Sequence, residues 1–407
     1  MATTLAHRPI SSSGFFPDRP RITPLEFVTP LWLAGGMRIA AIGDAHLGRS
    51  YYPITTEGGV NQREWDFERA FEAAVEVALA ERPDLVVWLG DIFDHPRPSY
   101  RSYRVAQKAL ARIRDHGVDA VVITGNHDTP RLPGRGSPYS SLADTFGGFH
   151  FAHRLAYERF ELDGLVVHAV PQMLTVDASL DALDEAAGSR SGDKTNLLLT
   201  HPRLTQLQPR NADINEIEVD ANRLQSDLVL LGHYHTFARV TDTMWYAGST
   251  DTFSFADDPL REKGIVVLDT DAGACRHVPV PGARPLVTLE TVYALGLSPS
   301  ELAERVMAQA VSVPEGAVAR LYLDGVDPEA YRMLDLQAVR DAAGAALLLK
   351  LEPQYTSTTM HAELPTVEGL GGQWEGYLEG QDLTGLDRDR LVKAGHDYIT
   401  DAIEAAG

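Results

Sequence analysis

Five short segments that lie far apart in this 407-residue chain share one pattern. In each of them, an apolar run ends in residues that are able to bind a metal ion or to transfer a proton. These end residues are Asp44, His46, Asp91, Asn126, His127, His201, His233 and His235. Carboxylate, imidazole and amide donors without any thiolate favour a hard or borderline divalent cation. The sequence therefore predicts a metal site to which all five segments contribute.

The number of candidate ligands predicts two cations rather than one. A single zinc site takes three or four ligands, and the candidates other than His127 are too many for that. We expect two cations that share Asp91. Two cations about 3.5–4 Å apart stabilise the attacking and the leaving oxygen of an in-line displacement at phosphorus. His127 then remains as a donor to the transition state or the leaving oxygen, and Asp128 is a candidate to orient it.

Each of these residues, taken alone, has a simpler explanation. A single histidine at the end of a strand is usually packed in the core or exposed to solvent. The combination of all five segments, each following an apolar run, favours a shared metal site over independent packing roles.

The apolar runs predict buried strands, and the stretches between the first of them predict helices. Strands are predicted at 38–43, 85–89, 120–124, 165–170, 196–200, 228–231, 244–247 and 264–269. Helices are predicted at 64–80 and about 99–115, where apolar residues recur at three- and four-residue spacing. The strand–helix–strand order predicts parallel pairing, and ligands collect at the carboxyl ends of such strands. The last two strands have no helix between them, which indicates a mixed or antiparallel second sheet.

Four regions are predicted along the chain. They are an irregular extension at 1–36, a layered α/β domain at 37–281, a small α+β module at 282–352, and a linker with a C-terminal helix at 353–407. The extension is rich in proline, and Met37 is a candidate for the true start. In the small module, Ser298 and Glu301 have the spacing of a helix capping box. The linker is rich in glycine around 369–372, and the last helix is expected near 388–405.

Composition excludes several classes of protein. Hydrophobic residues make up 44% of the chain, which excludes wholesale disorder. No apolar run approaches the roughly 20 residues of a membrane helix. The single cysteine, Cys275, excludes an intrachain disulfide and favours the cytoplasm. A net charge of -21 argues against a basic surface that coats nucleic acid. It leaves a phosphodiester substrate open, because bound cations supply positive charge.

The five segments resemble the motifs of the calcineurin-like metallophosphoesterases. The matching stretches are GDAH at 43–46, GD at 90–91, GNHD at 125–128, His201, and GHYH at 232–235. The resemblance implies one metal held by Asp44, His46, Asp91 and His235, and a second held by Asp91, Asn126, His201 and His233, with His127 catalytic. One departure is Thr200, which precedes His201 where many members of the family have glycine.

Finer features are similar to DNA repair exonucleases of the SbcD type. These features are the stretch GDIFDHPRPS at 90–99 and the position of the small α+β module. The resemblance implies a β-sandwich flanked by helices, a capping domain that contacts DNA, and two metal ions, with Mn²⁺ preferred. It also implies a homodimer and an SbcC-type coiled-coil ATPase bound through the C-terminal segment. Some relatives have a histidine three residues after the bridging aspartate, where this chain has Asp94 followed by His95, and neither receives a role.

Arginines and aromatic residues near the motifs are candidates to contact a substrate. The candidate substrate-binding residues are Arg97, Arg131 and Arg135, and the candidate stacking residues are Tyr51, Tyr52, Phe253 and Phe255. Arg97 also begins a row of basic residues at helical spacing, for which a solvated helix face is the simpler explanation. Loop packing is likewise the simpler explanation of the aromatic residues.

Two other functions remain open. The first is a small-molecule or nucleotide phosphodiesterase or phosphatase on the same metal core. The second is a DNA-end-binding scaffold without catalysis, against which the intact set of ligands argues.

Overall fold

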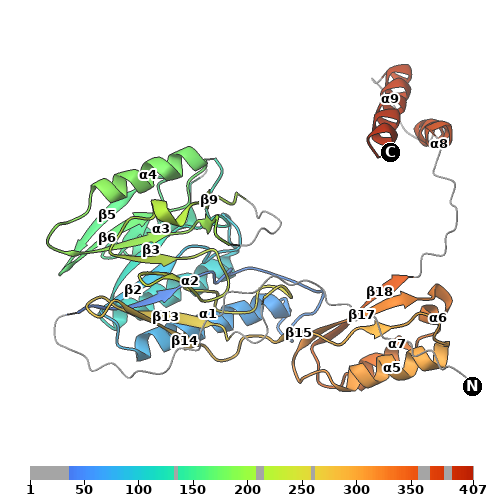
Figure 1. Cartoon of the computed structure of the whole chain (residues 1–407), viewed down its shortest axis with the longest axis horizontal. Helices are drawn as coiled ribbons and strands as arrows, with labels where there is room; N and C mark the ends of the chain where they lie inside the picture. The colour runs from blue at the N-terminus through green and yellow to red at the C-terminus, as the bar shows by residue number, and fades with distance from the viewer. Residues whose placement is uncertain are drawn as a thin grey trace, which may run out of the picture. The chain divides into compact units, whose positions relative to one another are not determined.

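The computed structural model describes residues 36–132, 136–207, 215–257, 262–355, 367–379 and 387–406 (Figure 1). The predicted N-terminal extension, apart from Gly36, lies outside the described residues, and so does Arg135. The candidate start at Met37 and the four domain boundaries stay predictions. No helix in the described part of the chain is both long enough and apolar enough to cross a membrane.

Six strands form the first sheet, in the order β14-β13-β1-β2-β3-β4. They are β1 (Arg38–Ile42), β2 (Leu85–Leu89), β3 (Asp119–Ile123), β4 (His150–Ala152), β13 (Gly264–Asp269) and β14 (Ala274–Pro279). Strands β1 to β4 pair in parallel, whereas β13 pairs antiparallel with β1 and with β14. All five residues of β2 are buried, as expected for an apolar strand inside a parallel sheet.

Six further strands form the second sheet, in the order β11-β12-β10-β7-β6-β5. They are β5 (Glu158–Leu162), β6 (Leu165–Val170), β7 (Thr195–Thr200), β10 (Leu228–Leu231), β11 (Ala238–Thr241) and β12 (Met244–Tyr246). The four inner strands are parallel, and the edge strands β5 and β11 are antiparallel to their neighbours. Val87 of the first sheet and Leu199 and Leu230 of the second belong to one core cluster. The predicted layered sandwich is therefore confirmed.

The strand β13 corrects one expectation. We expected 244–247 and 264–269 to lie in the same second sheet. That sheet is mixed and contains β12, but β13 returns to the first sheet and pairs with β1. Five of the six residues of β13 are buried. Such a continuous apolar strand suits the interior of either sheet, so its composition does not identify its partner.

Helices cover the outer faces of the sandwich. They are α1 (Gln62–Ala80), α2 (Tyr100–Asp115), α3 (Pro138–Thr145) and α4 (Val176–Gly188). Phe71 of α1 and Leu110 of α2 share a core cluster with Trp88 of the first sheet. Leu183 of α4 packs in a cluster with Val229 of the second sheet. A short sheet of β8 (Arg203–Leu204) and β9 (Glu218–Val219) and the 3₁₀ helix η2 (Ala221–Arg223) follow β7 in the chain.

Residues 286–355 form a third, parallel sheet with its own helices. The elements are β15 (Leu286–Thr288), β16 (Val292–Tyr293), α5 (Pro299–Val311), β17 (Val318–Val326), α6 (Pro328–Arg332), α7 (Leu336–Ala342) and β18 (Leu348–Tyr355). Strand β17 pairs with β15 and β16 along successive parts of its length, and it also pairs with β18. The predicted capping box is present, because the side chains of Ser298 and Glu301 each accept from the other's backbone N–H. Val306, Leu321 and Val339 lie in the core of this module.

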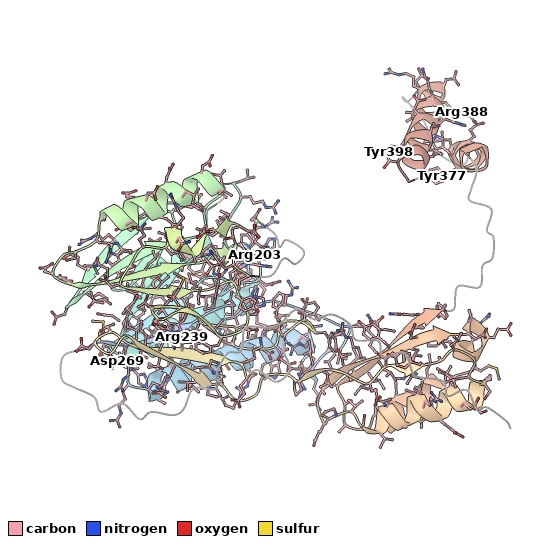
Figure 2. The ribbon with its side chains drawn as sticks, in the orientation of Figure 1. Arg203, Arg239, Asp269, Tyr377, Arg388 and Tyr398 are labelled. Atoms are coloured by element: carbon pink, nitrogen blue, oxygen red, sulfur yellow. The ribbon has the colours of Figure 1, made fainter. Side chains whose placement is uncertain are left out.

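The C-terminal segment corrects a second expectation. It contains α8 (Val367–Glu379) as well as the predicted helix, here α9 (Arg388–Ala406) (Figure 2). The glycine-rich stretch expected to be a linker is helical, and its glycine lets the other helix approach closely. A Cβ atom on Gly371 would fall 2.4 Å from a ring carbon of His396, and one on Gly395 would fall 2.0 Å from Nε1 of Trp374. Glycine here marks a close approach of two helices rather than a flexible chain.

A buried ion network ties the first turn of α1 to the loop after β12. Arg63 is 1% exposed, and its Nη1 lies 2.9 Å from Asp66 Oδ2 and 3.0 Å from Asp251 Oδ2. Its Nη2 donates to the carbonyl oxygen of Thr252 at 2.7 Å. Arg284 adds hydrogen bonds from its guanidinium to Asp66 and from its backbone N–H to Asp251. The network therefore fixes the residues that immediately precede Phe253.

We expect Arg63→Met to destabilise the protein by about 3–5 kcal/mol, because it leaves the buried carboxylate of Asp251 without a cation, whereas Asp66 keeps Arg284. Chemical denaturation followed by circular dichroism measures the change. The matched control is Arg69→Met on the same helix, where the arginine is 63% exposed and pairs with Glu72. We expect that control to lose less than about 1 kcal/mol. Equal losses in the two variants would contradict a structural role for the buried network.

Candidate metal centre

The predicted ligands follow the carboxyl ends of five strands that come from both sheets. Asp44 follows β1, Asp91 follows β2, Asn126 follows β3, His201 follows β7 and His233 follows β10. Six of the eight predicted site residues are buried: Asp44, His46, Asp91, Asn126, His127 and His201. His233 and His235 are partly buried. The structure therefore brings together the residues that the sequence singled out.

The backbone at the ligands adopts conformations that side chains rarely take. The φ angle is 46° at Asp44, 46° at His46, 50° at Asp91 and 92° at His233. Each such residue costs of the order of 1–3 kcal/mol unless surrounding contacts impose it. Here the backbone N–H of His233 donates to Asp44 Oδ1 at 2.9 Å, and that of His46 donates to the carbonyl oxygen of Asp91 at 2.8 Å. Hydrogen bonds between the motifs thus stabilise these backbone turns, and the turns direct the ligand side chains toward the site.

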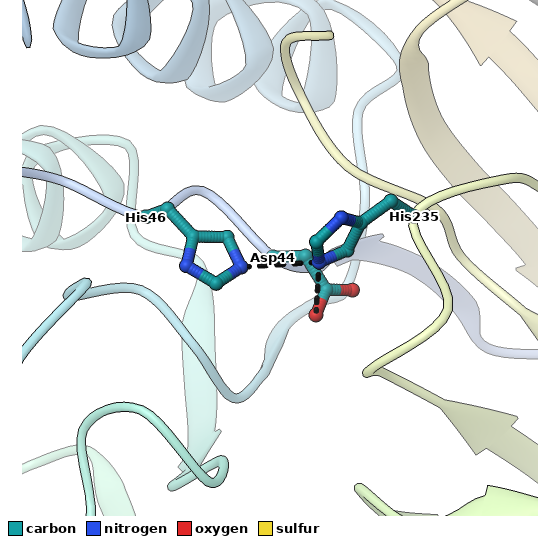
Figure 3. Close-up of side chains that lie close together, drawn as sticks. All are labelled: Asp44, His46 and His235. Carbon is teal, nitrogen blue, oxygen red and sulfur yellow. Dashed lines mark hydrogen bonds and ion pairs between the residues drawn. The ribbon is translucent and has the colours of Figure 1, made fainter. Parts of the chain in front are cut away.

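Asp44, His46 and His235 form the first donor group, with ligand atoms within 4.8 Å of one another. Figure 3 shows the two imidazole rings turned toward each other above the carboxylate. His46 Nε2 lies 3.1 Å from His235 Nε2, which lies 3.9 Å from Asp44 Oδ1. One oxygen and two ring nitrogens facing a common point suit a divalent cation.

Asp91, His201 and His233 form the second donor group, also within 4.8 Å of one another. His201 Nε2 lies 3.1 Å from Asp91 Oδ2, and His233 Nδ1 lies 3.1 Å from Asn126 Oδ1. The same Asp91 oxygen is 3.9 Å from Nε2 of His46 in the first group. Asp91 therefore faces both groups, which is the arrangement that a shared ligand requires.

Unpaired buried atoms test whether these residues fit cations. Asp44 Oδ2 is buried and has no hydrogen-bond partner in the described part of the chain. His201 Nε2 is also buried, and it faces Asp91 Oδ2 at 3.1 Å without the geometry of a hydrogen bond. A buried polar atom without a partner costs about 1–3 kcal/mol, so such atoms are rare. A bound cation would satisfy both of them. The donor set therefore fits two divalent ions.

The pKa values of the site residues reflect their burial and their mutual charge. Burial raises the pKa of Asp44 to about 7. Burial opposes ionisation of His201, but the neighbouring Asp91 raises the pKa of that imidazole to about 9. His201 in turn outweighs the burial of Asp91 and lowers its pKa. Burial and then His46 lower the pKa of His235, which keeps it in the neutral form that binds metal.

His127 lies beside these groups and is 7% exposed. Its backbone N–H donates to Asp91 Oδ1 at 2.8 Å, and its ring Nδ1 lies 3.3 Å from the carbonyl oxygen of Asp94. Asp128 was predicted to orient this ring. Its carboxylate accepts from the backbone N–H groups of Gly125 and Ile92 and so joins the loops after β2 and β3. Its role toward the imidazole stays a prediction.

Sequence reasoning missed two supports of the site. Asp94 received no role, yet its Oδ1 lies 3.1 Å from His46 Nδ1 and orients that ring. A carboxylate behind a ligating histidine is a common support of metal sites, and its position three residues after Asp91 was the available signal. Tyr139 of α3 donates its hydroxyl hydrogen to the buried Asp128. Nothing in the local sequence of Tyr139 indicated that contact.

A further carboxylate lies next to the second donor group. Glu216 Oε1 is 3.8 Å from His233 Nε2 and 3.2 Å from Nε of Arg203. Figure 2 labels Arg203 in the strand β8. Glu216 was not predicted, because its segment carries no motif and reaches the site only through the tertiary fold.

The basic residues predicted to contact a substrate lie either beside His127 or on the helix α2. Arg97 and Arg131 line a cavity of about 960 Å³ that His127 also lines. The basic row on α2 is partly neutralised, because Arg101 pairs with Glu68, and Arg112 likewise pairs with Glu76 of α1. These ion pairs join α2 to α1, and one of them involves the buried Glu68.

The aromatic candidates pack against other side chains. The ring centroid of Phe253 lies 4.5 Å from that of His46 and 4.3 Å from that of His235. The guanidinium carbon of Arg320 lies 4.5 Å from the ring centroid of Phe255. Phe253 thus packs against two of the proposed metal ligands.

A sequence profile described as calcineurin-like phosphoesterase matches residues 37–237. This part of the chain belongs to the calcineurin-like metallophosphoesterase superfamily. Three of the curated relatives that match are named DNA double-strand break repair protein Mre11. The protein of Saccharolobus solfataricus is 27% identical over 56% of this chain and 56% of its own length. That of Thermoplasma acidophilum is 26% identical over 61% and 66%. That of Aeropyrum pernix is 26% identical over 91% and 92%.

The extent of these matches differs. The chain spans between about half and two thirds of the length of the first two relatives, and nearly the whole of the third. The superfamily and the similarity to DNA double-strand break repair proteins agree with the resemblance found in the motifs. The narrower SbcD type stays a prediction.

We expect Gly125→Ala to lower the affinity for Mn²⁺ by about 10- to 100-fold, the usual effect of disturbing a support of a ligand. A Cβ atom at this position would fall 2.2 Å from Asp91 Oδ1, so the carboxylate must move. Titration of free Mn²⁺ by electron paramagnetic resonance measures the affinity. The control is Gly192→Ala, where the added carbon meets no atom within 4 Å. Unchanged affinity in Gly125→Ala would contradict Asp91 as a ligand.

Proposed function

We propose that the protein is a two-metal phosphodiesterase that hydrolyses DNA, and that it acts as an exonuclease in DNA repair. The observation that carries this proposal is the convergence of the five motifs around Asp91, which faces both donor groups. The names of the relatives support DNA as the substrate.

The proposal assigns the ligands as the motifs do. One cation is held by Asp44, His46, Asp91 and His235, and the other by Asp91, Asn126, His201 and His233. The oxygen and imidazole donors are suited to Mn²⁺, which we propose as the preferred ion. When bound, the two cations supply Lewis acidity toward the phosphate oxygens.

His127 is the proposed proton donor to the leaving oxygen. Its Nδ1 faces the carbonyl oxygen of Asp94, so proton transfer is assigned to Nε2. The carboxylate oxygen Oδ1 of Asp94 lies 3.6 Å from the same Nδ1, so Asp94 holds that side of the ring. Arg97 and Arg131, which share the neighbouring cavity, are the proposed contacts to the substrate.

A small-molecule or nucleotide phosphodiesterase is the second candidate. The net charge of -21 favours it, because a protein that binds long DNA usually has a basic face. A length series of single- and double-stranded oligonucleotides separates the two candidates. Hydrolysis confined to mononucleotides or other small esters would support the second candidate and overturn the first.

Further proposals concern partners and location. We propose that α8 and α9 bind an SbcC-type coiled-coil ATPase, since Tyr377 and Tyr398 on these helices are 59% and 77% exposed. A homodimer and a cytoplasmic location are proposed from the resemblance and the cysteine content.

We expect Asp91→Ala to abolish Mn²⁺-dependent degradation of end-labelled DNA, because it removes the carboxylate that both cations share. His127→Gln should lower kcat by about 10²- to 10⁴-fold, the usual contribution of a positioned proton donor. Mn²⁺ affinity in His127→Gln should change less than about threefold, since His127 is not a proposed ligand. Product length on denaturing gels and Mn²⁺ titration give the two readouts.

The control for these variants is Asp115→Ala, whose carboxylate is 63% exposed and pairs with Arg114 on the surface. It should degrade DNA like the unchanged protein. Full DNA turnover by Asp91→Ala would show that the metal centre is not the catalyst.

A further inference from the structure

Arg49 lies in the loop after the first motif, and neighbouring side chains fix its guanidinium. Its Nη1 is 3.1 Å from Asp94 Oδ1, and its Nη2 donates to the hydroxyl of Tyr51. The guanidinium carbon lies 4.6 Å from the ring centroid of Tyr51 and 4.3 Å from that of Phe253. The side chain still keeps 24% of its exposure. Arg49 is thus held rigidly beside the metal centre while part of it remains accessible.

These contacts leave the arginine with capacity for another anion. A guanidinium has five N–H donors, and its Nη atoms use only some of theirs on Asp94 and Tyr51. The Asp94 carboxylate is also shared, because its Oδ1 is 3.1 Å from His46 Nδ1. Asp94 therefore positions the guanidinium of Arg49 and also contacts His46, so it does not neutralise Arg49 alone.

The side chain of Arg49 is linked to the proposed ligand His46 through two intermediate residues. It touches Asp94 and Phe253, and each of these touches His46, at 3.1 Å and at a centroid distance of 4.5 Å respectively. A phosphate bound by the cations would lie next to the ligand side chains. A phosphate one nucleotide further along a strand would lie closer to the next layer of side chains, where Arg49 is.

We propose that Arg49 binds the phosphate adjacent to the scissile phosphate of a nucleic-acid substrate. An Nη2 N–H that is not used on Tyr51 can donate to a phosphate oxygen as a charge-assisted hydrogen bond. Stacking on two rings fixes the guanidinium in advance, so little entropy is lost on binding. This inference rests on the proposed function and deepens it, since it requires a substrate with at least two linked phosphates.

The alternative role of Arg49 is purely structural: it would hold Asp94 and, through it, His46. The two roles differ in the substrates that they affect. A structural residue affects every phosphodiester equally, whereas a contact to a neighbouring phosphate affects only substrates that have one. Bis(4-nitrophenyl) phosphate has a single phosphate and reports on the metal centre alone.

The test compares Arg49→Gln with the unchanged protein on a DNA oligonucleotide and on bis(4-nitrophenyl) phosphate, both with Mn²⁺. We expect KM for DNA to rise about tenfold with kcat within threefold, and kcat/KM for the small diester to stay within twofold. Binding of DNA in the presence of a chelator should show a salt dependence whose slope is smaller by about 0.7–0.9, the value for one lost phosphate contact. Arg49→Lys, which keeps the charge, should retain the slope.

Two controls keep the result specific. Arg159→Gln removes an arginine of 33% exposure that pairs with Glu161 on β5, and it should change neither KM nor the slope. A DNA carrying a neutral methylphosphonate next to the scissile linkage should raise KM of the unchanged protein about tenfold. It should then raise KM of Arg49→Gln no further. The methylphosphonate arm needs no variant, so an unchanged KM on this DNA would overturn the inference even if Arg49→Gln fails to fold.

Three outcomes would overturn the inference. Equal slowing of both substrates in Arg49→Gln would assign Arg49 a structural role. An unchanged KM and salt slope, in a protein whose unchanged form degrades DNA, would show that Arg49 contacts no phosphate. Cleavage of the small diester but not of DNA by the unchanged protein would overturn the proposed function itself, and this is seen before any variant is made.

Discussion

The close approach of the strand ends around Asp91 is the constraint on which the metal centre depends. A Cβ atom on Gly90 would fall 2.5 Å from His201 Nδ1, and one on Gly232 would fall 2.1 Å from the carbonyl oxygen of Leu89. Glycine therefore precedes the ligand in these motifs because no side chain fits where the two sheets meet. The backbone can come this close only without side chains, and the closeness lets one carboxylate face two donor groups.

Thr200 is the exception that clarifies this rule. It stands where many members of the superfamily have glycine, and it is the last residue of β7, paired in regular register with Val170 and Leu231. Its strand continues directly to His201, whose Nδ1 lies 2.6 Å from the carbonyl oxygen of Leu89. The crowding at this point is relieved by Gly90, which follows β2 of the other sheet, and by Gly232, which follows the neighbouring strand β10. His201 is therefore placed without a preceding glycine.

The parts of this arrangement that the sequence predicted are those that local pattern encodes. Apolar runs located the inner strands, and residue chemistry at their ends located the ligands. The sheet that β13 joins, the contacts of Asp128 and the approach of Glu216 depend on pairings between distant segments, so no local pattern encoded them. Gly371 was misread for the same reason, because a glycine in a close helix contact and a glycine in a flexible linker look alike in sequence.

The direct test of the shared carboxylate is electron paramagnetic resonance of the protein loaded with Mn²⁺. We expect two ions per chain, magnetically coupled because they lie about 3.5–4 Å apart. Binding of a single uncoupled ion, or of two ions that show no coupling, would contradict a centre in which Asp91 joins two cations.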